Sequence, residues 1–546
     1  MAHRSLGQRA PLLWLTVPLM AGLALGRLVG PLPLPVLLGG ATTAAGVAIL
    51  AARRNQFLAW ALTLAVAMLL AGWARLALQP VLPTEWLHLP PREAWLALRV
   101  EHRFGTRDPR RASGIGRIET ADPPLHGLAG QRIQYALRLA TGETVPLRGS
   151  VIRVRGVLAP LPPDPPAASF DAYLAAVGAT FRLTRGKILA ELRPPSRYEQ
   201  WCARQLDQLS AALGRGVEAK RPRLVGILRA MLLGQQQALA EDQATAFRQT
   251  GTMHVFSISG LHITVIASSL AALLALVRLP RWPRLAIGLV VLWLYVDITG
   301  GAPSAIRAFA MVAFVQISLA LRVPRQPLPA LTIAALAVML LSPLDLFSAS
   351  FQMSYAIVLA LLLLGLPLAE RWLEATDLFA DLPRVTWRWH HHLRRWIWRA
   401  LVGAVAIGVS TSLVGAVTGV TFFQLLTPGA LLANLWLVPA SSLVIIFGAV
   451  ALLCSFAGFA AGTLLANHAA VLVLWGIERG IAAMQALPGM WLAASFRPAW
   501  LGPAGLVLLL AVLVAGYQAR WQGWWRGAWP PFVLVALLLG LGVRLG

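Results

Sequence analysis

The chain has 546 residues, of which 58% are hydrophobic and only 13% charged, and its mean hydropathy is +0.67. A soluble chain would carry roughly a quarter charged residues, so this composition excludes an ordinary soluble globular protein. The net charge is +25, from 47 basic and 22 acidic residues. Two interpretations of that charge stay open: an anionic partner such as nucleic acid or lipid, or the arginine-rich bias of a GC-rich genome.

Three apolar stretches open the chain, at residues 11–29, 33–52 and 56–78. Each is long enough to cross a bilayer as a helix. The basic, then apolar, amino terminus resembles a signal peptide, but no clear small-residue cleavage site follows it. We therefore expect a retained first helix and a block of three transmembrane helices within residues 1–80.

A polar, arginine-rich region follows, at residues 85–195. It contains short runs of alternating apolar and polar residues, separated by Gly, Pro and Asp. This pattern predicts a small antiparallel β-barrel or sandwich. The five runs are Trp95–Arg103, Gly114–Glu119, Arg132–Leu139, Val151–Leu158 and Thr180–Leu183.

The rest of the chain is predicted to be helical. Residues 197–250 have the spacing of amphipathic helices, which would pack on a membrane domain or lie in the interface. Residues 251–546 form a second, larger transmembrane domain. The whole chain is thus predicted to be a polytopic α-helical membrane protein of about 12–13 spans with an inserted β-barrel. The later spans are placed near 255–277, 285–299, 303–321, 327–341, 346–368, 400–421, 429–453, 459–478, 499–517 and 530–544.

Basic residues in the loops predict the orientation, because cytoplasmic loops carry an excess of Lys and Arg. A single topology puts every strong basic cluster inside. It places the amino terminus in the cytoplasm and the β domain on the outer side of a bacterial inner membrane. The clusters are Arg4 with Arg9, Arg53 with Arg54, Arg278 with Arg281 and Arg284, Arg322 with Arg325, the segment Arg384–Arg399, and Arg520 with Arg526.

Four polar clusters lie where lipid would surround them. Polar groups at that depth are functional candidates by default, because an unsatisfied group costs several kcal/mol. The clusters are Ser257, Ser259, Gly260 and His262; Asp297, Ser304 and Arg307; Gln352 with its neighbours Ser354 and Tyr355; and Asn434 with Pro439.

Each cluster also has a structural interpretation. The Ser/Gly residues near His262 suit a helix-packing face. Arg307 suits either a side chain that reaches the outer interface or one that faces a polar path and meets phosphate. Gln352 suits an interhelical hydrogen bond. Asn434 and Pro439 suit a plain helix kink as well as a substrate path.

The residues of these clusters resemble the ComEC family of competence proteins. The resemblance rests on Phe247-Arg-Gln-Thr-Gly-Thr-Met-His254 and Ser257-Ile-Ser-Gly-Leu-His262, then on Gly300–Arg307, Ser350–Tyr355 and Leu432–Pro439, in the family's order. Ala302-Pro303-Ser304 departs from the family's Ser-Pro-Ser. The resemblance implies an inner-membrane channel for single-stranded DNA in natural transformation, with an outer OB-fold domain.

One further departure concerns a nuclease. Many family members carry a carboxy-terminal metallo-β-lactamase-like domain, and no His-x-His-x-Asp-His motif occurs in this sequence. His390–His392 is a contiguous run and does not have that spacing. We therefore expect no catalytic residue, cofactor or metal site in the chain. A nuclease, a DNA receptor and a cytoplasmic motor ATPase would be separate partners, beside single-stranded DNA and membrane lipid.

The leading hypothesis is a DNA-uptake channel. Its DNA path would include Ser257, Ser259, Gly260, His262, Asp297, Ser304, Arg307, Gln352, Asn434 and Pro439. Its DNA-binding β domain would use Trp95, Arg103, Phe104, Tyr135, Arg153 and Arg155. The Arg384–Arg399 loop could contact emerging phosphates or a motor. A transporter or envelope protein with a non-DNA substrate is the alternative, and a membrane-embedded enzyme using Ser259, His262 and Asp297 is a third hypothesis.

Overall fold

The computed structural model describes residues 11–30, 32–79, 86, 89–163, 165–322, 327–376, 378–379, 382–383 and 386–545. Arg4, Arg9, Arg325 and Arg384, used above for orientation, lie outside these residues. The chain forms two compact units. One comprises residues 1–208 and 270–351, the other residues 209–269 and 352–546.

All thirteen predicted spans coincide with helices, so the prediction of a polytopic helical membrane protein is confirmed. In the described part of the chain, eight helices are long and apolar enough to cross a membrane, and four apolar helices are shorter. The thirteenth is α11, which carries Arg281, Arg284 and Asp297. The early spans are α2 (Leu13–Val29), α3 (Leu34–Arg53) and α4 (Phe57–Ala77).

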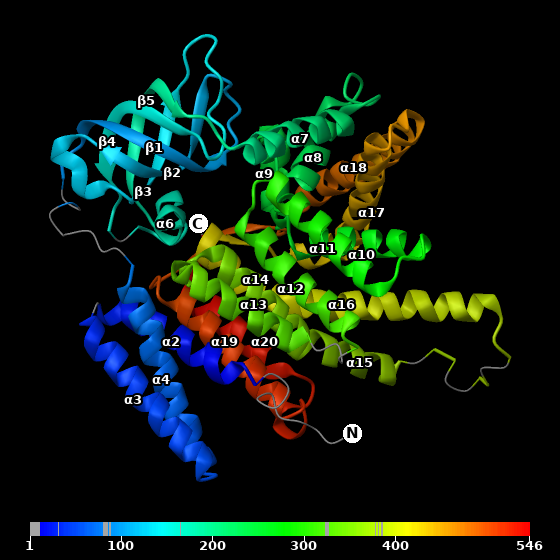
Figure 1. Cartoon of the computed structure of the whole chain (residues 1–546). Coiled ribbons are helices and arrows are strands. Elements are labelled where there is room, and N and C mark those ends of the chain that lie inside the picture. Colours follow the sequence, from blue (N-terminus) through cyan, green and yellow to red (C-terminus); the bar gives the residue numbers. More distant parts are fainter. Residues whose placement is uncertain are drawn as a thin grey trace. The chain divides into compact units, whose positions relative to one another are not determined.

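The ten later spans follow in the predicted order (Figure 1). They are α10 (Gly260–Leu276), α11 (Arg281–Ile298), α12 (Pro303–Ala320), α13 (Pro327–Leu341), the continuous run α14–η5–α15 (Ala349–Ala375), α16 (Trp389–Phe423), α17 (Ala430–Phe456), α18 (Ala460–Gln485), α19 (Leu501–Gln518) and α20 (Trp529–Gly542).

The polar region folds into a closed five-stranded barrel, as predicted. Its strands are β1 (Arg92–Phe104), β2 (Arg111–Ala121), β3 (Arg132–Arg138), β4 (Val151–Pro160) and β5 (Ala179–Arg193). Around the barrel the order is β1-β2-β3-β5-β4, and β4 closes on β1. Among these five described strands β3 and β5 form the one parallel pair, which departs from the predicted antiparallel arrangement.

Strand β5 is far longer than the predicted Thr180–Leu183. It pairs with β3 near its start and with β4 along most of its length, which closes the barrel. The missed half, from Lys187 onward, is mostly exposed. A strand that buries neither face shows no alternation, so periodicity could not reveal it.

Alternating apolar residues of the strands fill the barrel. Leu98, Val154 and Leu183 are completely buried in its core. The short helix α6 (Phe170–Ala176) lies between β4 and β5, and Ser169 caps it by accepting a hydrogen bond from the Ala172 backbone. The 3-10 helix η1 (Pro123–Leu128) connects β2 to β3.

Between the barrel and α10 the chain forms α7 (Arg197–Gly214), α8 (Pro222–Leu233) and α9 (Glu241–Gln249), with short 3-10 turns η2 (Gln236–Ala238) and η3 (Met253–Phe256). The completely buried Asn467 of α18 donates to the carbonyls of Ala212 and Arg215 at the end of α7. The last carbonyls of a helix have no hydrogen-bond donor within the helix. The Asn467 amide group donates to two carbonyls at this helix end.

Two local features were not predicted. The segment η5 (Leu361–Gly365) is a π-helical turn between α14 and α15, where Trp521 donates to the Leu363 carbonyl. A Cβ at Gly365 would lie 2.6 Å from Ser410 Oγ of α16, so the glycine permits a close helix approach. A small antiparallel sheet also forms from β6 (Leu425–Leu426), β7 (Leu492–Phe496) and β8 (Val543–Leu545).

Candidate functional site

The segment from Gly251 to His262 begins with a turn that only glycine suits. Gly251 has φ +70°, and a Cβ there would lie 2.8 Å from Thr427 Oγ1 and 2.9 Å from Ala430 Cβ. Thr250 and Thr252 both donate to the Phe247 carbonyl. This turn therefore packs directly on the start of α17, one helical turn before Asn434.

His262 caps its own helix. Ser259 precedes α10, and its backbone N–H donates to His262 Nδ1 at 3.3 Å, while its Oγ lies 3.1 Å from the same nitrogen. The bond from the Ser259 backbone is the one that a Glu or Gln side chain accepts in a capping box, with histidine here in that place. Because Nδ1 accepts, the neutral imidazole carries its proton on Nε2. That nitrogen is buried and has no partner among the described residues.

The other two residues of this cluster contribute less. Ser257 Oγ donates to the His254 carbonyl at 3.3 Å, which continues the turn. Gly260 is exposed, and a Cβ there would meet nothing within 4 Å. Its place at the first position of α10 does not require glycine.

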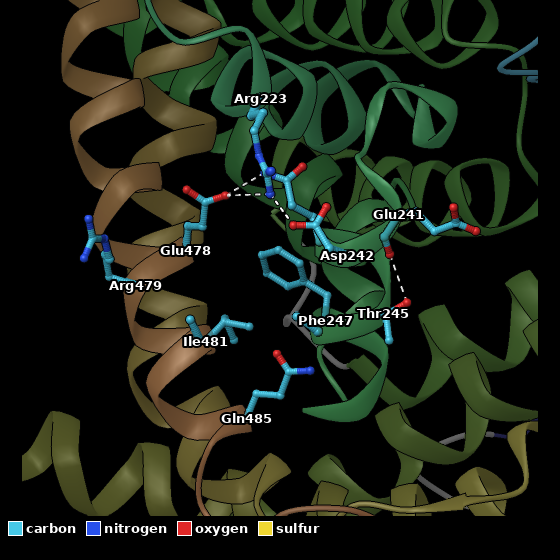
Figure 2. A pocket seen from close by; sticks show the side chains of 12 residues that line it. Arg223, Glu241, Asp242, Thr245, Phe247, Glu478, Arg479, Ile481 and Gln485 are labelled. Atoms are coloured by element: carbon cyan, nitrogen blue, oxygen red, sulfur yellow. Dashed lines mark hydrogen bonds and ion pairs between the residues drawn. The ribbon is translucent and has the colours of Figure 1, made fainter.

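A pocket lies next to the helix that leads into this segment (Figure 2). Its cavity of about 730 Å³ is lined by α8, α9 and α18. Arg223 pairs with Asp242 and lies 4.0 Å from Glu478, and Gln243 donates to Glu478 at 2.6 Å. The hydrogen bond from Arg223 lowers the pKa of Asp242. These polar groups satisfy one another and attach α9 to its neighbours, which positions the Gly251 turn.

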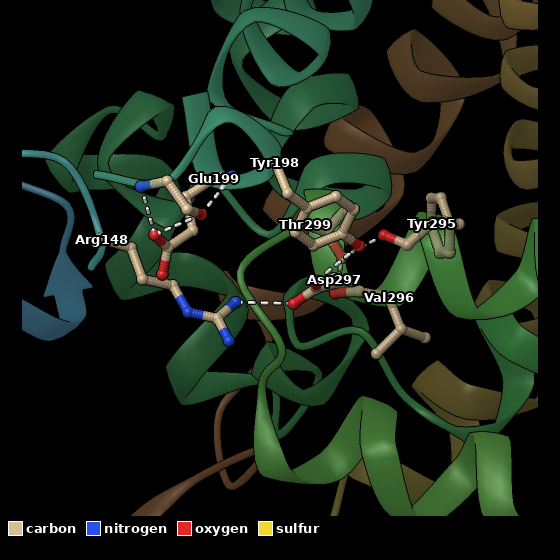
Figure 3. A network of polar contacts seen from close by, with 8 residues as sticks. Arg148, Tyr198, Glu199, Tyr295, Val296, Asp297 and Thr299 are labelled. Carbon is tan, nitrogen blue, oxygen red and sulfur yellow. Dashed lines mark hydrogen bonds and ion pairs between the residues drawn. The ribbon is translucent and has the colours of Figure 1, made fainter. Parts of the chain in front are cut away.

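Asp297 belongs to a network that the sequence did not reveal (Figure 3). Arg148, just before β4, donates to its Oδ1 at 2.6 Å, and Tyr198 of α7 donates to its Oδ2 at 2.8 Å. Desolvation and the bonded Asp297 carboxylate raise the pKa of Tyr198. Both carboxylate oxygens are thus occupied by residues more than 90 positions away in sequence, a separation no local pattern can reveal.

Arg307 is buried inside its unit. The side chain is 1% exposed, and its Nη2 donates to Ser350 O at 2.9 Å and to Ser350 Oγ at 2.6 Å. An arginine that reaches the interface would keep its guanidinium exposed, so that alternative is excluded.

Asp345 lies near this arginine, in the 3-10 turn η4 (Pro343–Phe347). Burial raises the pKa of Asp345, and the positive charges of Arg307 and Arg132 oppose that rise. Arg132 belongs to strand β3, so positive charges from the barrel and from α12 both act electrostatically on the Asp345 carboxylate. Asp345 was not among the predicted residues, because an isolated acid in a loop is common.

The remaining predicted path residues lie in helices. Ser304 is in the first turn of α12, Gln352 is in α14, and α17 continues through Asn434 and Pro439 without a break. Asn434 Oδ1 is buried without a partner among the described residues. Asp297, Ser304 and Arg307 fall in one compact unit, and the other seven predicted residues in the second.

On the barrel, three predicted residues share one face. Trp95 stands opposite Arg155 across the β1–β4 pair, and Arg153 stands two residues further along. All three are exposed, and the Arg155 guanidinium lies 5.3 Å from the Trp95 ring centroid. Arg155 also pairs with Glu93 at 2.5 Å, and that hydrogen bond lowers the pKa of Glu93. Arg153 forms no ion pair with a described residue.

Tyr135 does not fit the predicted role. It is 1% exposed and sits in the barrel core, where burial raises its pKa. A Cβ at Gly114 would lie 2.6 Å from its hydroxyl. The prediction that Tyr135 offers a stacking surface was wrong, because an aromatic residue in an alternating strand can face either side.

Phe104 belongs to a second aromatic group, with Phe170 and Tyr173 of α6. The Phe104 ring centroid lies 5.7 Å from that of Phe170, and the Phe170 and Tyr173 rings stack at 5.7 Å. Phe170 is 51% and Tyr173 40% exposed. Arg103, which precedes Phe104 in β1, is exposed. Phe170 and Tyr173 were not among the residues predicted for the barrel's DNA-binding surface.

A sequence profile described as "Competence protein" matches residues 231–522, which is more than half of the chain. The chain belongs to the competence protein family. All five motif segments of the ComEC resemblance fall within the matched residues, so that resemblance is confirmed.

Two curated competence proteins are similar to parts of the chain. ComE operon protein 3 of Bacillus subtilis (strain 168) is 29% identical over 142 residues, covering 26% of this chain and 18% of that protein. Competence protein ComA of Neisseria gonorrhoeae is 34% identical over 147 residues, covering 25% and 21%. The aligned segments thus span about a fifth of each relative. No solved structure matches the chain.

Proposed function

We propose that this competence-family protein takes part in DNA uptake as an inner-membrane channel for single-stranded DNA. The observation that supports it most directly is the combination of the family match with an exposed barrel face carrying Trp95, Arg153 and Arg155. Five-stranded OB-type barrels hold single strands by backbone charge and by base stacking on aromatic rings. The face provides both kinds of contact.

In this proposal the barrel lies outside the membrane and the amino terminus inside. The strand meets the barrel first, at the Trp95 face and at the exposed rings of Phe170 and Tyr173. It then follows polar residues of the helical region, from His262, Arg307 and Gln352 to Asn434. No Walker A sequence occurs in the chain, so ATP-driven pulling would come from a separate motor. A nuclease and a DNA receptor would be further partners.

The experiment is fluorescence anisotropy of a labelled oligothymidine with the full-length protein in neutral detergent, across a salt series. Phosphate contacts make the affinity fall as salt rises, with a logarithmic slope of about 0.7 per contact on single strands. Arg153→Gln should reduce that slope by about 0.7. Arg155→Gln should change it less, since Glu93 already neutralises Arg155.

Trp95→Ala should weaken binding by about 1–3 kcal/mol without changing the slope, because stacking does not release counterions. Arg138→Gln is the matched control, since Arg138 is an exposed barrel arginine on strand β3. Equal effects of Arg138→Gln and Arg153→Gln would refute a specific Trp95 face. No binding at low salt would favour the alternative, a transporter with a non-DNA substrate.

A further inference from the structure

The first three turns of α16 and the three residues before them have an unusual composition. We call residues 386–400 the α16 entry segment. It contains four Trp, four Arg and three His in fifteen residues and no acidic residue. In the whole sequence no Asp or Glu occurs between Asp381 and Glu478. The segment is therefore cationic and aromatic at once, which fits an anionic partner with an apolar part.

One side of the entry segment is apolar and open. Trp389 is 76% exposed, Leu393 45%, Trp396 68% and Ile397 51%. Positions separated by three, four and seven residues lie on one face of a helix. Two tryptophans and two aliphatic side chains thus form a continuous exposed stripe.

The other side is covered by the chain that precedes it. Trp398 Nε1 donates to the Thr376 carbonyl at 3.0 Å. The His391 ring lies 4.8 Å from that of Phe379, and the His392 ring lies 5.2 Å from that of Trp387. These contacts fix which side of the helix stays open.

Arginines flank the open stripe. Arg388, Arg394 and Arg399 are exposed, and none forms an ion pair with a described residue. Arg395 lies 5.0 Å from the centroid of the Trp387 ring, on the covered side. The result is an amphipathic helix with an apolar face bordered by uncompensated positive charge.

The length of α16 sets the depth of this segment. The helix has 35 residues, or about 52 Å at 1.5 Å per residue. The hydrocarbon core of a bilayer is about 30 Å thick, and about 40–45 Å with the headgroups. The apolar remainder of α16, from Leu401 onward, fills the hydrocarbon, so the entry segment extends into the headgroup region, where Trp and Arg are favoured.

We infer that the α16 entry segment is a docking surface for anionic phospholipid. Trp389, Leu393, Trp396 and Ile397 insert among the upper acyl chains, and Arg388, Arg394 and Arg399 bind headgroup phosphates. A single-stranded nucleic acid suits this surface less well. Its bases would stack on rings beside the arginines, whereas Arg395 already covers Trp387 and the open stripe is half aliphatic. The inference does not depend on a role in DNA uptake.

The test measures lipid binding by the full-length protein in neutral detergent, using native mass spectrometry. Phosphatidylglycerol and phosphatidylcholine of equal chain length are titrated separately. We expect phosphatidylglycerol to be retained preferentially. The variant Arg388→Gln/Arg394→Gln/Arg399→Gln should weaken phosphatidylglycerol binding by roughly tenfold or more and leave phosphatidylcholine binding unchanged. Trp389→Ala/Trp396→Ala should weaken binding of both lipids.

The matched control is Arg204→Gln/Arg221→Gln/Arg248→Gln, which removes the same charge from exposed positions on or beside α7, α8 and α9. If the control and the test variant lose phosphatidylglycerol binding equally, the inference is overturned, because any three exposed arginines would then contribute the same affinity. Equal retention of both lipids by the unaltered protein would also overturn it. So would a test variant that loses oligothymidine binding while its preference for phosphatidylglycerol is unchanged. Thermal melting of each variant separates these outcomes from misfolding.

Discussion

The β-barrel and the helical regions use polar side chains in opposite ways. The barrel core is apolar, and its arginines lie on the outside, where Arg117 pairs with Glu101 and Arg155 with Glu93. The helical regions instead bury polar groups, among them Arg307 at 1% exposure, His262 at 1% and Asn467 at 0%.

The buried polar residues of the helical regions share one structural role. Each of these three buried residues bonds main chain at or near a helix end: Asn467 at the end of α7, His262 before α10, and Arg307 at the start of α14. Lipid supplies no water to such ends, so protein groups must satisfy them. A polar motif residue can therefore serve the fold and a transport path at once, and experiments must separate the two roles.

Arg307 should show the largest effect of any residue in this comparison. Arg307→Ala removes the donor to Ser350 O and Ser350 Oγ and one of the two positive charges near Asp345. A hydrogen bond from a charged group contributes about 1.5–3 kcal/mol, so we expect a loss of several kcal/mol. Thermal melting in detergent, followed by size-exclusion chromatography, should show most of the protein unfolded or aggregated.

The matched control is Arg281→Ala, at the exposed start of α11. Surface substitutions usually change stability by no more than about 0.5 kcal/mol, so this variant should melt like the unaltered protein. A similar melting temperature for both variants would mean that Arg307 is dispensable for the fold, and a role in a polar path alone would then remain.

The sequence predicted only part of this difference between the β-barrel and the helical regions. Hydropathy found the helices of all thirteen predicted spans, and alternation found the five strands of the barrel, because both signals are local. Partners distant in sequence were not predictable. The residues around Asp297 in the sequence do not predict its hydrogen bonds with Arg148 and Tyr198. The residues around Asn467 do not predict its hydrogen bonds with the end of α7. The same limit explains Tyr135, whose burial depends on which strands flank it.

His262 offers a sharper test, because its two ring nitrogens have different roles. His262→Ala removes the cap and the Nε2 donor together, and loss of a cap costs about 0.5–2 kcal/mol. His262→Gln keeps a capping-box residue at the third position of the helix but removes the imidazole. The unaltered protein and the Gln variant should therefore have similar stability, and the Ala variant should be less stable.

Uptake of labelled DNA, at matched protein levels in the membrane, then separates the roles. If the strand passes His262, uptake should fall at least several-fold in both variants. Full uptake with the Gln variant and impaired uptake with the Ala variant would assign His262 to capping alone, and would remove it from the proposed path.

The smallest expected effect lies in the barrel, at His102. Burial, aided by the positive charge of Arg148, lowers the pKa of this imidazole. An unfolded histidine takes up its proton near pH 6.5, and the folded barrel does so only at lower pH. The stability from His102 is thus fully present above about pH 6.5 and is lost as the pH falls toward the folded pKa. The slope cannot exceed about 1.4 kcal/mol per pH unit for one proton.

Hydrogen–deuterium exchange of peptides from β1 and β2 in the full chain can detect this local change. From pH 7.5 to 5.5, protection relative to the intrinsic rate should fall more in the unaltered protein than in His102→Gln. His126→Gln, an exposed histidine in η1, should behave like the unaltered protein. Identical pH dependence in all three would show that the barrel does not discriminate against a charged His102. The contrast between an apolar barrel core and helical regions that bury polar groups would then fail at this position.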